Sequence, residues 1–190
     1  RVNALERPIR QTHGKRFPSA GVLSEIISLS RNTFEPIAEV VDWKHPRFIS
    51  FTEPIESVAV EYDRRKRLAN SMDFDDLLIN LVKLLDIESV GKKLAQQFEY
   101  VLVDEYQDTN KIQAEIVRRF ASVHHNLLVV GDDAQSIYAF RGATIDNIMN
   151  FPKLFETKKE KVAIHKLQIN YRSTPEILHV ANHVIKANVR

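Results

Sequence analysis

The chain has 190 residues, enough for one ordinary domain or for parts of two. Hydrophobic residues make up 44% of it, so it can bury a core, and the absence of cysteine excludes disulfide scaffolds and thiolate metal sites. No stretch approaches the roughly 20 apolar residues of a membrane helix, and no secretory signal opens the sequence, so we expect a cytoplasmic protein without a membrane partner.

The net charge is only +2, but the charged residues are unevenly distributed. Residues 71–110 contain three basic and nine acidic residues, whereas basic residues predominate in 1–70 and 111–190. An acidic centre between basic flanks suits a metal–nucleotide site beside a groove for a polyanion. Ordinary solvated surfaces produce the same pattern, so charge alone leaves both interpretations open.

The first third of the chain is predicted to be helical. Apolar residues recur at helical spacing over residues 22–29, and Ser19 or Ser24 can cap this helix. Residues 43–46 break the pattern, and helical spacing resumes at Thr52 with a proline in the first turn. We therefore expect helices on both sides of a break near residue 45.

The helix that begins at Thr52 runs into four consecutive basic residues, Arg64 to Arg67. They form either a solvated helix end that the helix dipole favours or a contact with nucleic-acid phosphate. Asp73 then opens another predicted helix, which has a broad apolar face over residues 77–85. Capping is the expected role of Asp73, because helix N-termini favour acidic side chains.

Two apolar runs further along the chain predict parallel strands. Residues 100–103 indicate a strand buried on both faces, and residues 127–130 a second one. The segment between them, 110–122, has apolar residues at helical spacing, so the unit is predicted to be strand–helix–strand. Carboxylates follow each strand directly: Asp104, Glu105 and Asp108 after the first, Asp132 and Asp133 after the second.

These acidic residues are candidates for a magnesium site. Ligands in open α/β sheets bind beyond the carboxyl ends of the strands, which is where the acids fall. Hard cations prefer oxygen ligands, and Mg²⁺ keeps waters and phosphate oxygens as its other ligands. The spacing therefore predicts a Mg²⁺ site at one edge of the sheet.

The loop after the second strand, residues 131–143, carries two aromatic side chains, Tyr138 and Phe140. Either they belong to a hydrophobic cluster under the loop, or they are presented to bases. Stacking on aromatic side chains contributes roughly 1–3 kcal/mol per base in single-strand binders.

The last part of the chain is predicted to contain a helix over 144–155 that ends or kinks at Pro152, and a strand over 162–169. A final helix capped by Ser173 or Thr174 has apolar residues expected to be buried. The corner before it holds Tyr171 and Arg172. An arginine there forms an ordinary surface ion pair or binds a phosphate bidentately.

Three ordered signatures give this chain a family resemblance: VDEYQDTN at 103–110, GDDAQSIYAFRGA at 131–143 and NYRS at 170–173. Together they resemble superfamily 1A helicases of the UvrD, Rep and PcrA type, and DFDDLL at 73–78 resembles the segment leading back into their first motor domain. The resemblance implies an α/β fold, a partial P-loop NTPase (RecA-like) motor preceded by a helical insertion. Its implied boundaries are 1–72 for the insertion, 73–160 for the second half of the first motor domain and 161–190 for the start of the second.

The resemblance also implies an ATP- and Mg²⁺-dependent DNA helicase or translocase, moving 3′→5′ in repair, replication or recombination. Asp104 would hold Mg²⁺, and Glu105 would be the general base for the water that attacks the γ-phosphate. Gln135 would sense the γ-phosphate. Arg172 would reach it from the second motor domain, and Tyr171 would stack on adenine.

On the DNA side, the resemblance implies single-stranded DNA and duplex junctions as partners; it names no protein partner. Tyr138 and Phe140 would lie under the translocating strand. Less specific coupling roles fall to four residues: Gln107, Asp108, Asp132 and Arg141.

The sequence departs from the family pattern at three places. Ala134 stands where an aspartate is usual, and Phe140 where a tryptophan is usual. No phosphate-cradling G-x-x-x-x-G-K-[ST] loop occurs among the five glycines. We therefore expect an internal piece of a helicase, which by itself binds ATP weakly and turns nothing over.

Three other functions remain possible on the sequence. The chain can belong to the motor of a helicase–nuclease recombination subunit. It can be a non-catalytic, nucleic-acid-binding relic of the motor fold, which the missing phosphate loop favours. It can also be a Mg²⁺-dependent phospho-acceptor domain using Asp104 or Asp132, in which the aromatic loop has no purpose.

Overall fold

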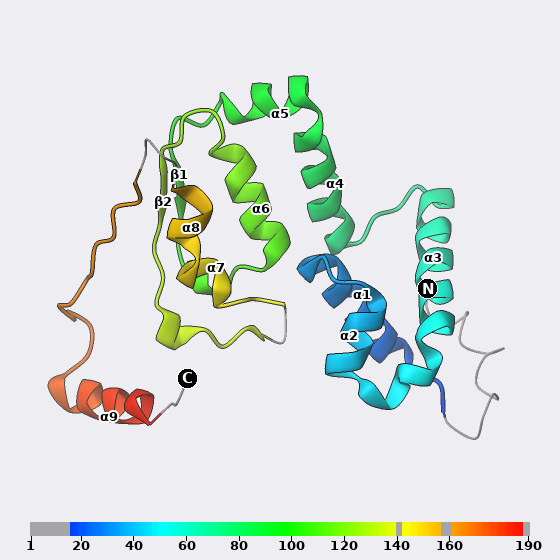
Figure 1. The fold of residues 1–190 in the computed structure, drawn as a ribbon, viewed down its shortest axis with the longest axis horizontal. Coiled ribbons are helices and arrows are strands. Elements are labelled where there is room, and N and C mark those ends of the chain that lie inside the picture. The colour runs from blue at the N-terminus through cyan, green and yellow to red at the C-terminus, as the bar shows by residue number, and fades with distance from the viewer. Residues whose placement is uncertain (1–15, 140–141, 157–160, 188–190) are drawn as a thin grey trace.

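The computed structural model describes residues 16–139, 142–156 and 161–187. Its architecture is α/β: a group of helices, a two-stranded parallel sheet with helices beside it, and then an extended segment leading to a last helix (Figure 1). The predicted DNA-contacting residues Phe140 and Arg141 lie outside the described residues.

The first group of helices surrounds the main hydrophobic core. It consists of α1 (Ala20–Thr33), α2 (Ile37–Lys44), the 3₁₀ helix η2 (Pro46–Phe51) and α3 (Thr52–Leu68). The break predicted near residue 45 is confirmed, whereas α2 is a helix that the apolar spacing did not predict. The core side chains, each contributing roughly 1.5–3 kcal/mol when fully buried, are Phe17, Leu23, Ile26, Leu29, Val40, Val41, Phe48, Phe51, Ile55 and Val58.

Helices α4 (Phe74–Asp86) and α5 (Glu88–Ala95) connect this group to the sheet. Asp73 caps α4 as predicted: its carboxylate accepts from the backbone N–H of Asp76, and Asp76 accepts in return from the N–H of Asp73. This reciprocal box satisfies two N–H groups that would otherwise lack partners at the start of the helix.

A cluster of charged side chains fastens α4 to α1 and α3. The guanidinium of Arg31 is paired with Asp63 and Asp73. The ammonium group of Lys66 lies 2.7 Å from Asp73 Oδ2 and 2.6 Å from Asp76 Oδ2. The side chains of Arg31 and Lys66 are only 12% and 10% exposed. These two shielded cations therefore hold carboxylates from different helices together.

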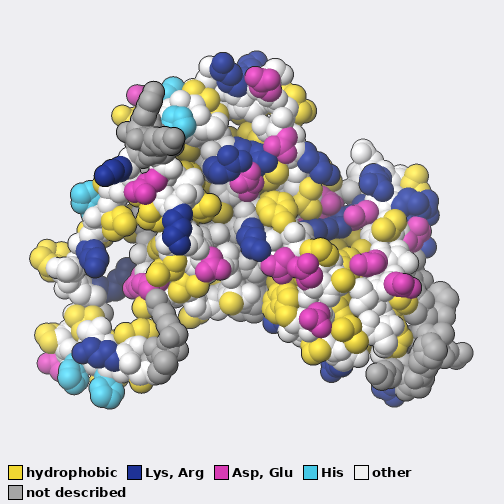
Figure 2. Space-filling model, viewed as in Figure 1, with side chains coloured by type: hydrophobic (Ala, Val, Ile, Leu, Met, Phe, Trp, Pro, Cys, Tyr) yellow, Lys and Arg dark blue, Asp and Glu magenta, His cyan; other side chains and the backbone are white. Residues whose placement is uncertain are grey.

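The contacts of the basic run at the end of α3 favour the helix-end interpretation over a contact with phosphate. Arg64 and Arg65 donate to Glu61, one turn earlier, at 2.6 and 2.8 Å. Lys66 is committed to the acidic cluster. On the face shown in Figure 2, basic and acidic side chains are interspersed. The run is thus a paired helix end, because most of its cations already have carboxylate partners.

We expect the Asp73→Asn substitution to remove a pH-dependent part of the stability. Burial by itself would raise the pKa of Asp73, but hydrogen bonds from Lys66 and from the Asp76 N–H outweigh it and lower the pKa from 3.8 to about 2. The carboxylate therefore stabilises the fold above pH about 4, and this contribution is lost as the pH falls towards 2. The amide oxygen of asparagine can still cap α4, so the substitution keeps the cap but removes the oxygen that accepts from Arg31, Tyr62 and Lys66.

Urea unfolding at several pH values measures this effect. The variant should be less stable than the parent by about 1–3 kcal/mol at pH 7, and the difference should shrink below pH 4. Asp42→Asn, at an exposed position on α2, is the control and should change little. Parallel stability curves for the parent and the Asp73 variant would contradict the prediction.

The strand–helix–strand unit is confirmed. β1 (Val101–Val103) and β2 (Leu127–Val129) pair in parallel, with Leu102 opposite Leu128, and α6 (Lys111–Phe120) connects them. The prediction that the strands are buried on both faces is wrong. Residues on one face are exposed, including Leu102 at 71% and Leu128 at 55%. The reason is that both faces of a sheet are buried only where helices or other strands cover each of them.

The helix predicted over residues 144–155 is two short helices, α7 (Asp146–Met149) and α8 (Phe151–Phe155). The division falls at Asn150, and Pro152 lies in the first turn of α8. This matches the predicted kink, because proline is tolerated in a first helical turn but not in a helix interior. Phe151 packs edge-on against Tyr106 and so anchors α8 to the segment that follows β1.

Two predictions for the C-terminal part are wrong. Residues 162–169 form no strand, because no neighbouring segment of the described chain pairs with them. Helix α9 (Pro175–Lys186) exists, with Thr174 at its N-cap, but its apolar side chains are not buried. Figure 1 shows the extended segment and α9 set apart from the sheet. None of the helices in the described ranges has the length and apolar character needed to cross a membrane.

Candidate active site at the carboxyl edge of the sheet

The predicted catalytic acids follow β1 directly. Asp104 and Glu105 are both exposed, and Asp104 Oδ1 accepts from the backbone N–H of Glu105 at 2.9 Å. Glu105 has φ 51° and ψ 43°, a left-handed conformation that costs a non-glycine residue roughly 1–2 kcal/mol. The backbone turns at Glu105 and enters the 3₁₀ helix η3 (Tyr106–Asp108). This turn brings the carboxylate of Glu105 next to Gln107.

Gln107 joins the ends of the two strands. Its side chain is buried, its Nε2 donates to Glu105 Oε2 at 2.8 Å, and its Oε1 accepts from the backbone N–H of Asp132 at 3.1 Å. Asp132 in turn accepts through Oδ2 from Gln135 Nε2 at 2.8 Å. Glu105 and Gln135, which come from different strand ends, are therefore connected by a continuous chain of hydrogen bonds. We call this series, Glu105–Gln107–Asp132–Gln135, the polar relay.

Gly131 makes room for the relay. A Cβ atom at this position would lie 2.6 Å from Gln107 Oε1 and 2.7 Å from Ile148 Cδ1. A larger residue at position 131 would therefore require the ends of the Gln107 and Ile148 side chains to shift. The 3₁₀ helix η4 (Asp133–Gln135) then turns the chain so that Gln135 returns towards Asp132.

Two buried polar atoms beside the relay lack partners among the described residues. They are the hydroxyl of Tyr106 and Oδ1 of Asp108. Burial raises the pKa of Tyr106, so its hydroxyl stays protonated. A buried carboxylate oxygen without a donor is costly unless water, a cation or a further donor reaches it.

The donor set fits a magnesium ion that keeps most of its water. Asp104 is exposed and uses only Oδ1 in its hydrogen bond to the backbone of Glu105, so Oδ2 can face a cation. No group of three or more metal-binding side chains occurs in the described ranges. The residues present therefore suit Mg²⁺ held by one carboxylate, with waters and phosphate oxygens completing its shell, rather than an all-protein cage.

The other predicted site residues are not all brought to this edge. Tyr138 is half-buried in the loop after η4. Tyr171 is 90% exposed and Arg172 is also exposed. At this corner Asn170 Oδ1 accepts from the backbone N–H groups of Arg172 and Ser173. We call residues 104–108, which follow β1, the acidic corner. The side chains of Tyr171 and Arg172 make no hydrogen bond to it within the described part of the chain.

Sequence reasoning assigned Gln107 only a general coupling role, and it missed Asn110. Asn110 is the N-cap of α6 and exchanges hydrogen bonds with Gln113, three residues later. An Asn–x–x–Gln spacing ahead of an apolar helical pattern is the signal that would have identified it. The burial of Gln107 has no comparable signal, because glutamine is mostly an exposed residue.

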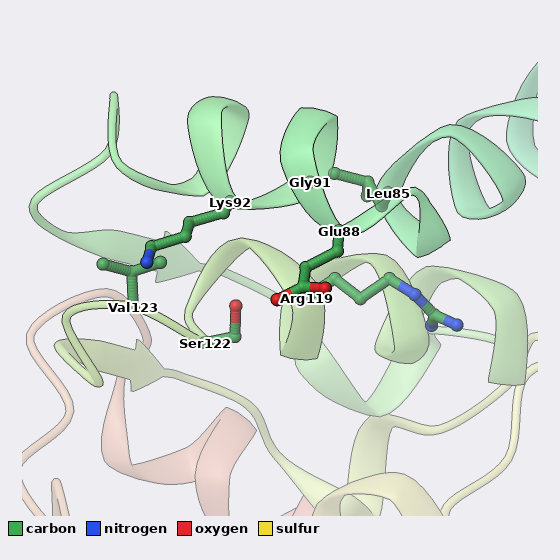
Figure 3. Close-up of a pocket in the computed structure, with 7 residues that line it drawn as sticks. All are labelled: Leu85, Glu88, Gly91, Lys92, Arg119, Ser122 and Val123. Atoms are coloured by element: carbon green, nitrogen blue, oxygen red, sulfur yellow. The ribbon is translucent and has the colours of Figure 1, made fainter.

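A hollow of about 460 Å³ between α5 and α6 is not the site (Figure 3). Its lining contains none of the predicted catalytic residues: Leu85, Glu88, Gly91, Lys92, Arg119, Ser122 and Val123. The chemistry that the side chains support lies at the other end of this unit, at the carboxyl edge of the strands.

The sequence model of the family described as "UvrD/REP helicase N-terminal domain" matches residues 28–156, which contain the acidic corner, the whole relay and the aromatic loop. The chain belongs to the UvrD/REP helicase family. The match begins within α1 and ends at the last residue before the gap at 157–160. Tyr171 and Arg172 lie beyond it.

Individual relatives carry the name ATP-dependent DNA helicase PcrA. The chain is 37% identical to that of Bacillus subtilis over 182 residues, which cover 94% of this chain and 23% of the relative. It is 38% identical to that of Leuconostoc citreum over 164 residues, which cover 86% of this chain and 21% of the relative. It is 43% identical to that of Staphylococcus aureus over 138 residues, which cover 72% of this chain and 18% of the relative. The chain thus spans about a fifth of the length of these UvrD/REP relatives.

Proposed function

We propose that this chain is part of an ATP-driven DNA helicase or translocase, a partial P-loop NTPase motor acting on single-stranded DNA and duplex junctions. The observation that carries the proposal is the polar relay, which links the proposed base Glu105 to the proposed phosphate sensor Gln135 across two parallel strands. Such a connection suits hydrolysis of a nucleotide, because phosphoryl transfer depends on groups held in fixed positions around the γ-phosphate.

The proposed chemistry is hydrolysis of the γ-phosphate of ATP. Glu105 takes a proton from water as the water oxygen bonds to the γ-phosphorus and the bond to the ADP oxygen breaks. Gln107 orients the Glu105 carboxylate by donating to Oε2. Mg²⁺ held by Asp104 would neutralise the phosphate oxygens. Arg172 and Tyr171 would complete the site after closure of the segment that carries them.

The proposal extends to the organisation of the protein. Residues 1–72 are proposed as the helical insertion, 73–160 as the second half of the first motor domain and 161–190 as the start of the second. We further propose movement in the 3′→5′ direction, a role in DNA repair, replication or recombination, and a cytoplasmic location. The helicase part of the proposal is supported by the sequence identity between this chain and relatives named ATP-dependent DNA helicase.

The Tyr138→Ala substitution tests the proposed DNA contact. In the complete motor polypeptide, the concentration of single-stranded oligonucleotide giving half-maximal ATP hydrolysis should rise roughly 5- to 100-fold, because one stacked base is lost. Tyr100→Ala is the matched control, since Tyr100 is exposed and precedes the opposite end of β1. Half-maximal concentrations that shift equally in both variants would contradict the contact. Absence of any DNA-stimulated hydrolysis in the parent would overturn the function itself.

A further inference from the structure

The last turn of α1 contains two buried polar side chains, Asn32 and Thr33. Thr33 is satisfied within its own helix, because its hydroxyl donates to Leu29 O at 2.7 Å. Asn32 also has a local hydrogen bond, from Nδ2 to Ser28 O at 2.9 Å. Its side chain forms further hydrogen bonds to residues at the starts of two other helices.

The carboxamide of Asn32 contacts the first turn of α4 and the N-cap residue of α6 simultaneously. Its Nδ2 donates to Asp75 Oδ1 at 2.8 Å, in the first turn of α4. Its Oδ1 accepts from Asn110 Nδ2 at 2.9 Å, in a hydrogen bond that is itself buried. A buried amide that uses both ends is strongly oriented, since any rotation leaves a polar group unpaired.

Asn110 connects this contact to the proposed nucleotide corner. It ends the segment that begins at Asp104, and it forms an antiparallel bridge with Ala143. The neighbouring backbone is joined as well: Thr144 N donates to Thr109 O at 3.3 Å, and Asn147 Nδ2 donates to the same oxygen at 2.9 Å. The acidic corner and the far end of the aromatic loop are therefore fastened to each other.

The end of the aromatic loop also rests directly on α1. Gly142 has φ +79°, and a Cβ atom there would lie 3.2 Å from Thr33 Cγ2 and 3.7 Å from Asn32 Cβ. Three segments thus meet at one turn of α1: the start of α4, the acidic corner through Asn110, and the loop that carries Tyr138. Asn32 is the side chain that contacts or approaches all three.

We infer that Asn32 is a positioning residue that couples the nucleotide corner to the DNA-facing loop through the end of α1. This inference rests on the proposed function. Asn32 touches no reacting group; it holds Asn110, and with it the corner and the loop, in one orientation relative to the N-terminal helices. Loss of its amide should uncouple the two sites while leaving each of them intact.

The test measures ATP hydrolysis by the complete motor polypeptide with and without single-stranded oligonucleotide. Asn32→Ala should lower the ratio of stimulated to basal kcat roughly five- to fifty-fold, the usual range of coupling between sites. Basal kcat and the KM for ATP should stay within about twofold, because Asn32 binds neither ligand. Asn80→Ala, at an exposed position on α4, is the control and should leave the ratio unchanged.

A pair of further variants keeps the inference testable if Asn32→Ala does not fold. Asn32→Asp places a carboxylate against Asp75 and removes the donor, so it should also lower the ratio. Adding Asp75→Asn reverses donor and acceptor: the amide at position 75 can donate to the carboxylate at 32, which still accepts from Asn110. The double variant should recover part of the stimulation, because Ser28 O, which accepts from Asn32 Nδ2 at 2.9 Å, still lacks a donor.

Two results would overturn the inference: an unchanged ratio in Asn32→Ala and Asn32→Asp, or equal losses of basal and stimulated rates without recovery in the double variant. The second result is what a purely structural role produces. Glu105→Gln separates this from failure of the proposed function. If that variant is inactive while the Asn32 variants keep the parental ratio, hydrolysis at the corner stands and only the coupling role is lost.

Discussion

Glu105→Gln should abolish DNA-stimulated ATP hydrolysis in the complete motor polypeptide, lowering kcat roughly 10²- to 10⁴-fold, the usual contribution of a general base. The geometry should survive, because a glutamine oxygen can still accept the hydrogen bond that Gln107 Nε2 donates to Glu105 Oε2. Asp104 and its bond to the backbone N–H of residue 105 are unaffected. ATP binding should therefore change little, and the loss should lie in kcat rather than in nucleotide affinity.

Steady-state hydrolysis and binding of a fluorescent ATP analogue check these two statements separately. Glu99→Gln is the matched control, because Glu99 is an exposed glutamate ahead of the opposite end of β1. It should leave both quantities at parental values. Undiminished turnover in the Glu105 variant would remove this residue from the role of base. A joint loss of binding and turnover would indicate a collapsed corner instead.

Gly91→Ala should cause the largest loss of stability among glycine-to-alanine substitutions at the described glycines. A Cβ atom at Gly91 would lie 2.1 Å from the carbonyl oxygen of Leu85 and 3.0 Å from its carbonyl carbon. Both are backbone atoms at the end of α4, so they can move only if α5 shifts away from α4. Overpacking of this kind costs roughly 1–3 kcal/mol and occasionally more. The melting temperature should fall by about 5–10 °C.

Gly21→Ala is a control with the opposite expected sign. Gly21 is also helical, in the first turn of α1, but a Cβ atom there meets nothing within 4 Å. Replacing a helical glycine in open space stabilises by roughly 0.5–1 kcal/mol, because the unfolded chain loses freedom. The melting temperature, measured by circular dichroism, should thus fall for Gly91→Ala and rise slightly for Gly21→Ala. Equal shifts would mean that α5 does not approach Leu85 this closely.

The local elements were predictable where one short segment carries its own chemistry. The acidic first turn after Asp73 predicted the cap of α4, and proline at position 152 predicted the division between α7 and α8. The parallel pairing of β1 and β2 followed from a helical connection between two apolar runs. The UvrD/REP family was recognisable for the same reason, since its signatures are contiguous stretches at strand ends.

Burial was predicted less well, because it depends on which surfaces meet. Leu102 and the apolar residues of α9 have the pattern of core residues, yet they are exposed because no layer covers them in the described part of the chain. In the opposite direction, Gln107 and Asn32 are polar residues that the fold buries. Each has a partner far away in the sequence: Asp132 is 25 positions from Gln107, and Asn110 is 78 positions from Asn32. Spacing along the chain carries no information about such contacts.

The amino-acid sequence by itself determined the start of α4 at its Asp73 cap, the carboxylates at the ends of two parallel strands and the family, because each depends on neighbouring residues. Only the tertiary structure decided that Gln107 joins Glu105 to Asp132 and that one amide on α1 holds the corner and the loop. The physical reason is that a buried polar group must find its partner wherever packing places one. In this chain packing places those partners on different helices and strands.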